Sequence, residues 1–392
     1  MSKLESYKDK HIIKVISGVR RCGKSTLLKM FRDSLLASGI EDSQTIFINF
    51  EDYDNRELLE PGNLHTFLKS RLCKGKMTYV FLDEIQNVKD FQRVVDSLFL
   101  DEKTDIYLTG SNAFLLSGEL ATLLSGRYIE IKMLPLSFAE FIEVNELESA
   151  PLSQSYRRYV ETSSFPYASA FGDNKVEVHD YLRGVYSTIV LKDIIDRYKI
   201  AESKMLESVI RFVFDSIGSP LSVKKIADSL TSSGRKADPK TVEKYLSALL
   251  DSQIIYEAKR YDVKGKQRLK LQKKYYVVDI GMRATLLGQK GIDVGHILEN
   301  IIYLELLRRG YEVFVGKAKE TEIDFVAQNN LGNTYIQVAA TVRDESTLAR
   351  ELRPLQALHD SYPKLILTLD DDPDADYEGI RKINALDWLL QK

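Results

Sequence analysis

Three apolar segments near the start of the chain are rich in β-branched and aromatic residues, which suits buried strands. They span residues 12–16, 77–82 and 104–109. A helical pattern begins shortly after the first segment, near Thr26. Strands that alternate with helices in this way are typical of an α/β fold. The pattern therefore predicts an α/β domain over residues 1–135.

The next part of the chain has the spacing of helices. Apolar residues recur at three- and four-residue steps over 153–160 and 176–198. This spacing predicts a helical lid and a connecting bundle over residues 136–215.

Residues 216–285 are predicted to form a winged helix-turn-helix. Ser222 is suited to cap a first helix, and Gly234 is suited to end it. Asp238 followed by Pro239 is suited to start a second helix. Two strands that bracket a short basic turn follow the second helix and complete the pattern.

The remaining residues, 286–392, mix both periods and are predicted to form another α/β domain. Helices are expected over 297–309 and 347–359, and strands over 311–315, 322–326, 334–339 and 364–368.

Residues 18–25 match the pattern G-x-x-x-x-G-K-[ST] of a phosphate-binding loop in full. Its glycines let the backbone N–H groups turn toward phosphates, its lysine reaches the β- and γ-phosphates, and its hydroxyl reaches Mg²⁺. The helix that follows presents its N-terminus to the phosphates. The residues predicted to bind ATP are Gly18, Arg21, Cys22, Gly23, Lys24, Ser25 and Thr26, and Ser25 is also a predicted Mg²⁺ ligand.

Asp83 and Glu84 directly follow the second apolar segment. A carboxylate at the end of a neighbouring strand is what a Mg²⁺-nucleotide site requires, so Asp83 is predicted to hold the metal through water. Glu84 is predicted to act as the general base that polarises the attacking water. The alternative is that both residues only cap a helix that starts near Ile85.

Three further polar residues are candidates for the same site. Ser111 and Asn112 follow the third apolar segment, where a side chain can lie between Mg²⁺ and the γ-phosphate. An ordinary turn is the alternative for this pair. Arg127 precedes another apolar segment and is predicted to stabilise transition-state charge, with a surface arginine as the alternative.

Together these motifs resemble a large group of predicted bacterial and archaeal AAA+ ATPases with an uncharacterised C-terminal region. The resemblance covers nearly the whole chain, and its most specific part is Gly126-Arg127 followed by Pro135-Leu136-Ser137-Phe138. It implies a Mg²⁺-dependent ATP hydrolase. The family usually has Gly-Gly-Phe-Pro where this chain has Ser163-Ser164-Phe165-Pro166. The shape of that turn is therefore in question.

The composition adds few constraints of its own. No window approaches the eighteen or so apolar residues of a membrane span, and the N-terminus lacks the apolar core of a signal peptide. The two cysteines cannot build a disulfide framework, and the five histidines are scattered without zinc-like spacing. These features predict a cytoplasmic protein with no membrane partner.

The charge of the chain is unevenly distributed. Residues 220–274 hold fourteen Lys and Arg against six Asp and Glu, although the whole chain has a net charge of −2. A basic helix-turn-helix favours a nucleic-acid partner, and a protein-binding or spacer module is the alternative. The residues predicted to contact DNA are Lys240, Lys244, Lys264, Lys266 and Arg268.

Glu299, Asp324 and Gln337 have the order of the metal-binding residues in the PD-(D/E)XK nuclease fold, which the last domain resembles. That resemblance implies a lysine two residues after the last acid, and this chain has Ala339 there. Gln337 is neutral and therefore a poorer metal ligand than Glu. We expect a nuclease-like domain without cleavage, although both acids can also be structural.

These features lead to one main hypothesis about function. The protein is expected to be an ATPase that couples hydrolysis to binding or remodelling double-stranded or branched DNA, as a homo-oligomer in which Arg127 reaches a neighbouring subunit. The alternatives are a nucleotide-dependent switch that acts on a protein partner, and an active Mg²⁺-dependent nuclease.

Overall fold

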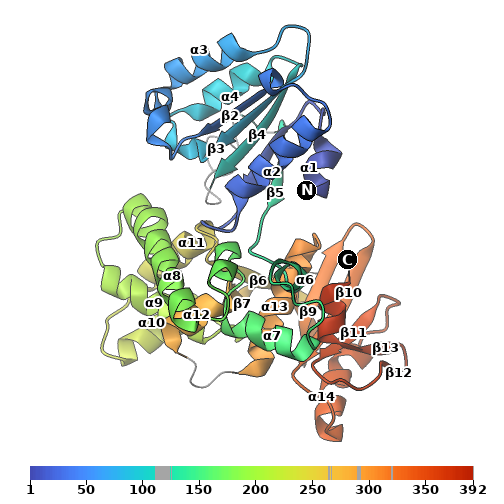
Figure 1. Cartoon of the computed structure of the whole chain (residues 1–392). Helices are drawn as coiled ribbons and strands as arrows, with labels where there is room; N and C mark the ends of the chain where they lie inside the picture. The colour runs from blue at the N-terminus through green and yellow to red at the C-terminus, as the bar shows by residue number, and fades with distance from the viewer. Residues whose placement is uncertain are drawn as a thin grey trace. The chain divides into compact units, whose positions relative to one another are not determined.

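The computed structural model describes residues 1–110, 124, 126–263, 265, 267–288, 293–318 and 321–391, with the backbone alone over 267–271. The chain divides into two compact units (Figure 1). The first contains Met1–Met133 with Asp251–Gln253, and the second contains Leu134–Leu250 with Ile254–Lys392. The break after Met133 lies two residues before the predicted end of the first domain. No described helix is both long and apolar enough to cross a membrane.

The first unit is built on a five-stranded parallel sheet in the order β2-β3-β4-β1-β5. Its strands are β1 (Ile13–Ser17), β2 (Thr45–Asn49), β3 (Thr78–Asp83), β4 (Thr104–Gly110) and β5 (Tyr128–Lys132). The α/β prediction for this part of the chain is therefore confirmed. Strands β1, β3 and β4 are buried along their whole length, which explains their continuous apolar sequence.

Helices cover both faces of this sheet. One face packs against α3 (Pro61–Arg71) and α4 (Phe91–Phe99) through a core that includes Leu64, Leu68 and Val95. The other face packs against α1 (Ser2–Tyr7) and α2 (Lys24–Ala37) through a core that includes Leu4, Leu28 and Phe31. Short 3-10 turns lie at η1 (Asp42–Gln44), η2 (Tyr53–Leu59) and η3 (Ile85–Asn87). The result is a three-layer domain whose sheet carries the phosphate-binding loop after β1.

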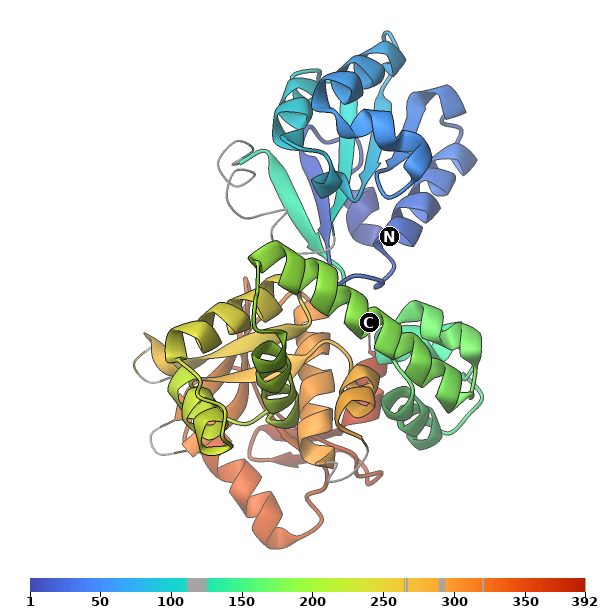
Figure 2. The ribbon, with the colours of Figure 1, turned by 90° about the vertical axis from the view of Figure 1, so that its left-hand side faces the viewer.

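The second unit begins with helices. They are α6 (Phe138–Val144), α7 (Leu152–Glu161), η5 (Pro166–Phe171), α8 (Lys175–Thr188), the π-helical η6 (Ile189–Asp196) and α9 (Ser203–Asp215). Figure 2 shows α8 and η6 as one long green helix. The helical expectation for residues 136–215 agrees with these elements.

The two helices and the hairpin expected over 216–285 are present as α10 (Val223–Ser232), α11 (Pro239–Asp251), β6 (Ile255–Asp262) and β7 (Gln267–Val277). Ser222 caps α10 by accepting a hydrogen bond from the Lys225 N–H, and Gly234 adopts a positive φ of 87° after that helix. Asp238 accepts from the Thr241 N–H at the start of α11. The local predictions for these caps are confirmed, whereas the winged-helix assignment stays a prediction.

The last part of the chain contains α12 (Ile280–Leu287), α13 (Val294–Arg308), α14 (Glu345–Gln356) and α15 (Ala385–Leu390). Its strands are β8 (Glu312–Ala318), β9 (Thr321–Asn329), β10 (Gly332–Ala339), β11 (Lys364–Thr368), β12 (Ala375–Tyr377) and β13 (Ile380–Asn384). The sequence did not predict α12, β12, β13 or α15.

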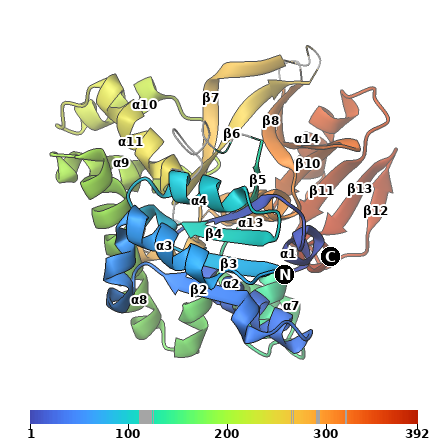
Figure 3. The same ribbon diagram turned by 90° about the horizontal axis from the view of Figure 1, so that it is seen from above.

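One eight-stranded sheet joins the predicted winged helix to the predicted nuclease-like domain. Its order is β12-β13-β11-β10-β9-β8-β6-β7, and Figure 3 shows it running from β7 to β12. Residues 259–262 of β6 pair in parallel with residues 314–317 of β8. The boundary predicted at 285 therefore separates strands that belong to the same sheet, and it stays a prediction.

The Ser163-Ser164 turn, where the resembled family has glycines, uses both of its hydroxyl groups. Each hydroxyl donates to Oδ2 of Asp279, at 3.1 Å from Ser163 and 2.7 Å from Ser164. The Ser164 N–H donates to the same oxygen at 2.7 Å. Neither serine has a positive φ, so the turn does not require glycine.

Candidate functional site

The phosphate-binding loop follows β1 and leads directly into α2. A Cβ atom on Gly18 would lie 2.4 Å from the carbonyl oxygen of Met133, so a side chain does not fit there. Gly23 has a φ of 104° and immediately precedes α2. Arg21 also has a positive φ, of 69°, and is exposed. The loop is thus curled tightly at the helix N-terminus, as an anion-binding turn requires.

Lys24 is buried, and its ammonium group is held by the loop itself. Its Nζ donates to the carbonyl oxygens of Gly18 at 2.9 Å and Val19 at 3.2 Å. Oε1 of Glu84 lies 3.8 Å from the same Nζ. A buried ammonium that faces the inside of the loop is placed to transfer these contacts to phosphate oxygens.

Asp83 ends β3 and receives two hydroxyl groups on one carboxylate oxygen. Ser25 Oγ donates to Oδ1 of Asp83 at 3.0 Å, and Thr109 Oγ1 donates to the same atom at 2.5 Å. The second oxygen, Oδ2, is buried and has no hydrogen-bond partner among the described residues. An orphaned anionic oxygen beside a serine hydroxyl fits a Mg²⁺ ion, because Mg²⁺ prefers oxygen ligands from one or two carboxylates and from phosphates.

Glu84 follows Asp83 in a left-handed conformation with a φ of 55°. Its N–H donates to Thr109 Oγ1 at 2.9 Å, and its Oε2 accepts from Gln86 Nε2 at 2.5 Å. Backbone strain of this kind is common at functional sites because surrounding contacts must hold it in place. The carboxylate is therefore oriented by Gln86 on one oxygen and faces Lys24 with the other.

Thr109 is the site residue that the sequence analysis missed. The parallel pairing of Leu82 with Leu108 places Thr109 beside Asp83. A linear sequence motif cannot reveal that Thr109 neighbours Asp83, because this depends on how β3 and β4 pair, and the two strands are far apart in sequence. The predicted residues Ser111 and Asn112 lie outside the described residues.

Cys22 and Thr26 complete the predicted ATP-binding residues. The Cys22 side chain is buried, with Sγ 3.6 Å from the carbonyl oxygen of Met133, and burial raises the pKa of its thiol. Thr26 lies exposed on the first turn of α2. Cys22 therefore supports the loop from inside, whereas Thr26 faces away from the core.

Arg127 lies at the opposite end of the sheet from this loop. Its carbonyl oxygen accepts from the N–H of Ile13, where β1 begins, whereas the phosphate-binding loop follows the end of β1. The guanidinium forms an ion pair with Asp96 and lies 5.7 Å from the Phe99 ring centre, with 43% of the side chain exposed. Arg127 consequently does not face the nucleotide site of its own chain.

The basic segment, residues 220–274, has fewer exposed and unpaired positive charges than its composition indicates. Arg260 pairs with Glu322, Lys273 pairs with Glu257, and Lys274 is buried. The exposed basic residues on or beside α10 and α11 are Lys224, Lys225, Arg235, Lys236, Lys240 and Lys244. Lys264, Lys266 and the side chain of Arg268 lie outside the described residues. Among the side chains that the structure describes in this segment, most of the exposed positive charge therefore lies on or beside the two helices.

Glu299, Asp324 and Gln337, which were predicted to form a vestigial metal site, lie close to one another in the second unit. Asp324 N–H donates to Gln337 Oε1 at 2.8 Å, and Lys274 Nζ contacts both Glu299 and Asp324. Burial alone would lower the pKa of Lys274, but the neighbouring carboxylates raise it above its ordinary value. Among the described residues, no group of three or more His, Cys, Asp or Glu side chains is arranged to hold a metal ion.

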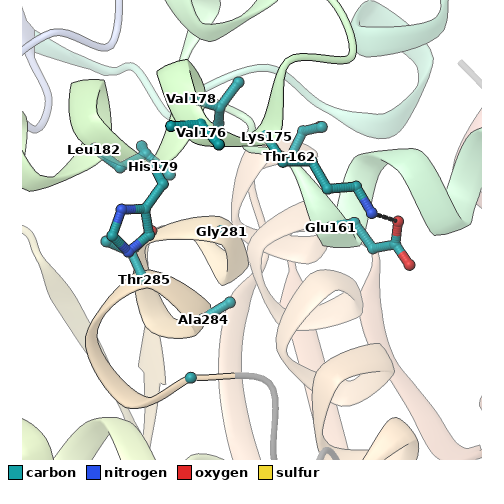
Figure 4. A pocket seen from close by; sticks show the side chains of 11 residues that line it. Glu161, Thr162, Lys175, Val176, Val178, His179, Leu182, Gly281, Ala284 and Thr285 are labelled. Atoms are coloured by element: carbon teal, nitrogen blue, oxygen red, sulfur yellow. Dashed lines mark hydrogen bonds and ion pairs between the residues drawn. The ribbon is translucent and has the colours of Figure 1, made fainter.

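A separate pocket of about 380 Å³ lies between α7, α8 and α12 (Figure 4). Lys175 and Glu161 form an ion pair of 2.8 Å at one side of it, and His179 lines another. None of the residues predicted to bind ATP, Mg²⁺ or DNA lines this pocket.

The fold and the loop define a P-loop α/β protein, and comparisons with known proteins specify the class. Residues 10–142 match the model of an AAA domain, and residues 153–293 match a domain of unknown function. The Walker-type ATPase PABY2304 of Pyrococcus abyssi has a similar fold, with a TM-score of 0.52 and 16% identity over 73% of this chain and 93% of that one.

Two relatives extend over almost the entire chain. An uncharacterized protein of Haemophilus influenzae is 39% identical over 100% of this chain and 97% of its own length. An uncharacterized protein of Methanocaldococcus jannaschii is 30% identical over 96% of this chain and 85% of its own length. The chain therefore belongs to the same family as these two proteins, and its N-terminal part is an AAA domain.

Proposed function

We propose that this protein is a Mg²⁺-dependent ATPase that couples ATP binding and hydrolysis to the binding or remodelling of DNA. The observation that carries the proposal is the meeting of Lys24, Ser25, Asp83 and Glu84 at the end of β3, beside the phosphate-binding loop. Each has the chemistry that phosphoryl transfer to water requires.

The residues divide the work of hydrolysis among them. Lys24 exchanges the carbonyl oxygens of Gly18 and Val19 for the β- and γ-phosphates of ATP. Ser25 and Asp83 would hold Mg²⁺, which stabilises the negative charge that develops on the transferred group. Once Lys24 moves away from Glu84, the free Oε1 of Glu84 can accept a proton from the attacking water, while Gln86 keeps the carboxylate oriented.

Two variants test the ATPase proposal. Lys24→Ala should abolish ATP binding, because the phosphates lose their only buried ammonium partner within the loop. Glu84→Gln should retain binding and lose hydrolysis, because the amide cannot accept the proton. Binding is measured with a fluorescent nucleotide, and turnover by phosphate release. Equal turnover in the parent protein and the Gln variant would remove Glu84 as the base.

The DNA partner is proposed from the exposed cations of α10 and α11. Lys240 and Lys244 lie four residues apart on α11, whose opposite side packs through Val242, Leu246 and Leu249. Lysines on one face of a helix can contact successive phosphates of a duplex. We propose that the nucleotide state, together with an assembly in which Arg127 reaches a neighbouring subunit, controls how this surface engages DNA.

Salt dependence distinguishes DNA from a protein partner. Duplex, forked and four-way DNA should bind and stimulate ATP turnover, with affinity that falls steeply as salt rises. Replacing Lys240 and Lys244 together by Ala should reduce the slope of log affinity against log salt by roughly 2. Replacing the exposed Lys192 and Lys204 by Ala is the control with the same charge change. If none of the DNAs binds or alters turnover, the DNA proposal fails and a switch on a protein partner is favoured.

A further inference from the structure

The side chain of Lys274 lies at the centre of three carboxylates in the second unit. Its Nζ is 2.9 Å from Oε1 of Glu299, 3.0 Å from Oε1 of Glu322 and 3.5 Å from Oδ1 of Asp324. Only 5% of the Lys274 side chain is exposed. Lys274 comes from β7, Glu299 from α13, and the other two acids from β9. One ammonium group thus connects three elements that are separate in sequence.

Further hydrogen bonds fix each carboxylate around this ammonium. Tyr276 OH donates to Oε1 of Glu299 at 2.6 Å, and Arg260 donates to Oε2 of Glu322 at 2.9 Å. The Val338 N–H donates to Oδ2 of Asp324 at 3.0 Å. The acids are therefore held in place by groups other than Lys274.

Gln337 extends the network away from the ammonium. Its Oε1 accepts from the backbone N–H of Asp324 at 2.8 Å, and its Nε2 donates to Oε2 of Glu351 at 2.6 Å. The side chain that the sequence analysis treated as a weak metal ligand is consequently used on both ends as a hydrogen-bonding link. It contributes no negative charge to the cluster.

We propose that the ammonium of Lys274 is the built-in counter-ion of this carboxylate cluster and occupies the position where a divalent cation would otherwise be held. Carboxylates this close together repel one another unless a cation lies between them. An ammonium has three N–H donors, which is enough to serve each of the three acids. The cluster therefore fastens β7 to α13 and β9 without metal, and it is independent of the proposed ATPase activity.

A metal-binding experiment on the full chain tests this assignment. Asp83→Asn is introduced first, so that the candidate site of the AAA domain does not contribute. Bound Mn²⁺ is then counted by electron paramagnetic resonance without nucleotide. With Lys274 in place, we expect no Mn²⁺ bound at the cluster. With Lys274→Met, the melting temperature should fall by roughly 10 °C, because the acids lose their counter-ion.

Mn²⁺ should recover part of that loss and bind in one equivalent to the Met variant, and Asp324→Asn should remove both effects. Lys273→Met is the matched control, because Lys273 lies on the same strand but pairs with Glu257 at the surface. Mn²⁺ that binds with Lys274 present and is lost with Asp324→Asn would overturn the proposal. A folded Met variant that gains no Mn²⁺ would do the same.

A measurement on the unsubstituted protein keeps the proposal testable if the Met variant does not fold. Reductive methylation followed by mass spectrometry should modify Lys273 readily and leave Lys274 unmodified, in EDTA as well as in Mn²⁺. Equal modification of both lysines would show that the ammonium is not held by the acids.

Discussion

Thr109 donates its hydroxyl hydrogen to Oδ1 of Asp83 at 2.5 Å, and it accepts the backbone N–H of Glu84 at 2.9 Å. One side chain on β4 therefore positions both acids at the end of β3. Because the hydroxyl donates to Oδ1, the other carboxylate oxygen of Asp83, Oδ2, has no hydrogen-bond partner among the described residues. The orientation of the proposed metal ligand and that of the proposed base consequently depend on the same group.

Thr109→Val should lower ATP turnover by roughly tenfold, which corresponds to about 1.4 kcal/mol of transition-state stabilisation. Valine has nearly the shape of threonine but can neither donate to Asp83 nor accept from Glu84. Phosphate release at saturating Mg²⁺-ATP measures the effect. Thr109→Ser keeps the hydroxyl and should retain most of the turnover. If the Val and Ser variants hydrolyse ATP equally fast, Thr109 does not position the acids.

Arg127→Ala should lower the turnover of the assembled protein by on the order of 10³-fold, if the guanidinium acts on a neighbouring subunit. Asp96→Asn releases the same guanidinium from its ion pair and is the control. It should change turnover little, because half-exposed ion pairs contribute only about 0–1 kcal/mol.

Mixing two inactive variants tests whether Arg127 acts at the nucleotide site of a neighbouring subunit. Lys24→Ala subunits retain Arg127, and Arg127→Ala subunits retain an intact nucleotide site. A mixture should therefore regain turnover if the arginine acts between subunits. A mixture as inactive as its components would contradict a role for Arg127 at the nucleotide site of a neighbouring subunit.

Cys22 should react with iodoacetamide much more slowly than Cys73. Burial raises the pKa of the Cys22 thiol, so less of the reactive thiolate is present at pH 7–8 than for an ordinary cysteine. As the pH rises toward the raised pKa, the reaction of Cys22 should accelerate. Cys73 is only half-buried and serves as the internal reference. Peptide mass spectrometry at several pH values measures both, and equal rates at pH 7.5 would contradict the buried position of Cys22.

Gly281→Ala should destabilise the second unit by roughly 3 kcal/mol, because the added atom overpacks a tight contact. A Cβ atom at this position would lie 1.7 Å from the carbonyl oxygen of Thr162. Gly184→Ala is the matched control, because Gly184 lies in α8 and, beyond its chain neighbours and its own helix backbone, no atom of the described residues lies within 4 Å of an added Cβ. The control should stabilise by about 0.5–1 kcal/mol. Thermal unfolding compares the two variants. Equal melting temperatures would contradict the tight contact between Gly281 and the carbonyl oxygen of Thr162.

The sequence predicted β1, β3 and β4 of the first unit well because these strands are buried throughout, and it predicted the loop because the spacing of its motif is fixed. The apolar segments at 12–16, 77–82 and 104–109 correspond closely to β1, β3 and β4. Thr109 was not predicted, because its role depends on the pairing between β3 and β4.

The second unit was harder to predict from the sequence, because the contacts that define its structure join residues far apart in the chain. Lys274 counts as a surface cation in the composition, yet it points inward to acids 25 to 50 residues away. The caps at Ser222 and Asp238 were predictable because they depend on neighbours three residues away. The pairing of β6 with β8 could not be predicted, because nothing in the local pattern of either strand specifies its partner.

That pairing decides where the chain can be cut. A protein ending at residue 285 would keep the hairpin of β6 and β7 but lose β8, so β6 would present an unpaired edge over residues 259–262. It would also lose Glu299, Glu322 and Asp324, which surround Lys274. Such a fragment should aggregate, whereas a cut after Met133 separates the two compact units except for Asp251–Gln253, which belong to the first. We therefore expect a shortened or transplanted chain to fold only if it keeps the helices with the exposed lysines together with the C-terminal strands.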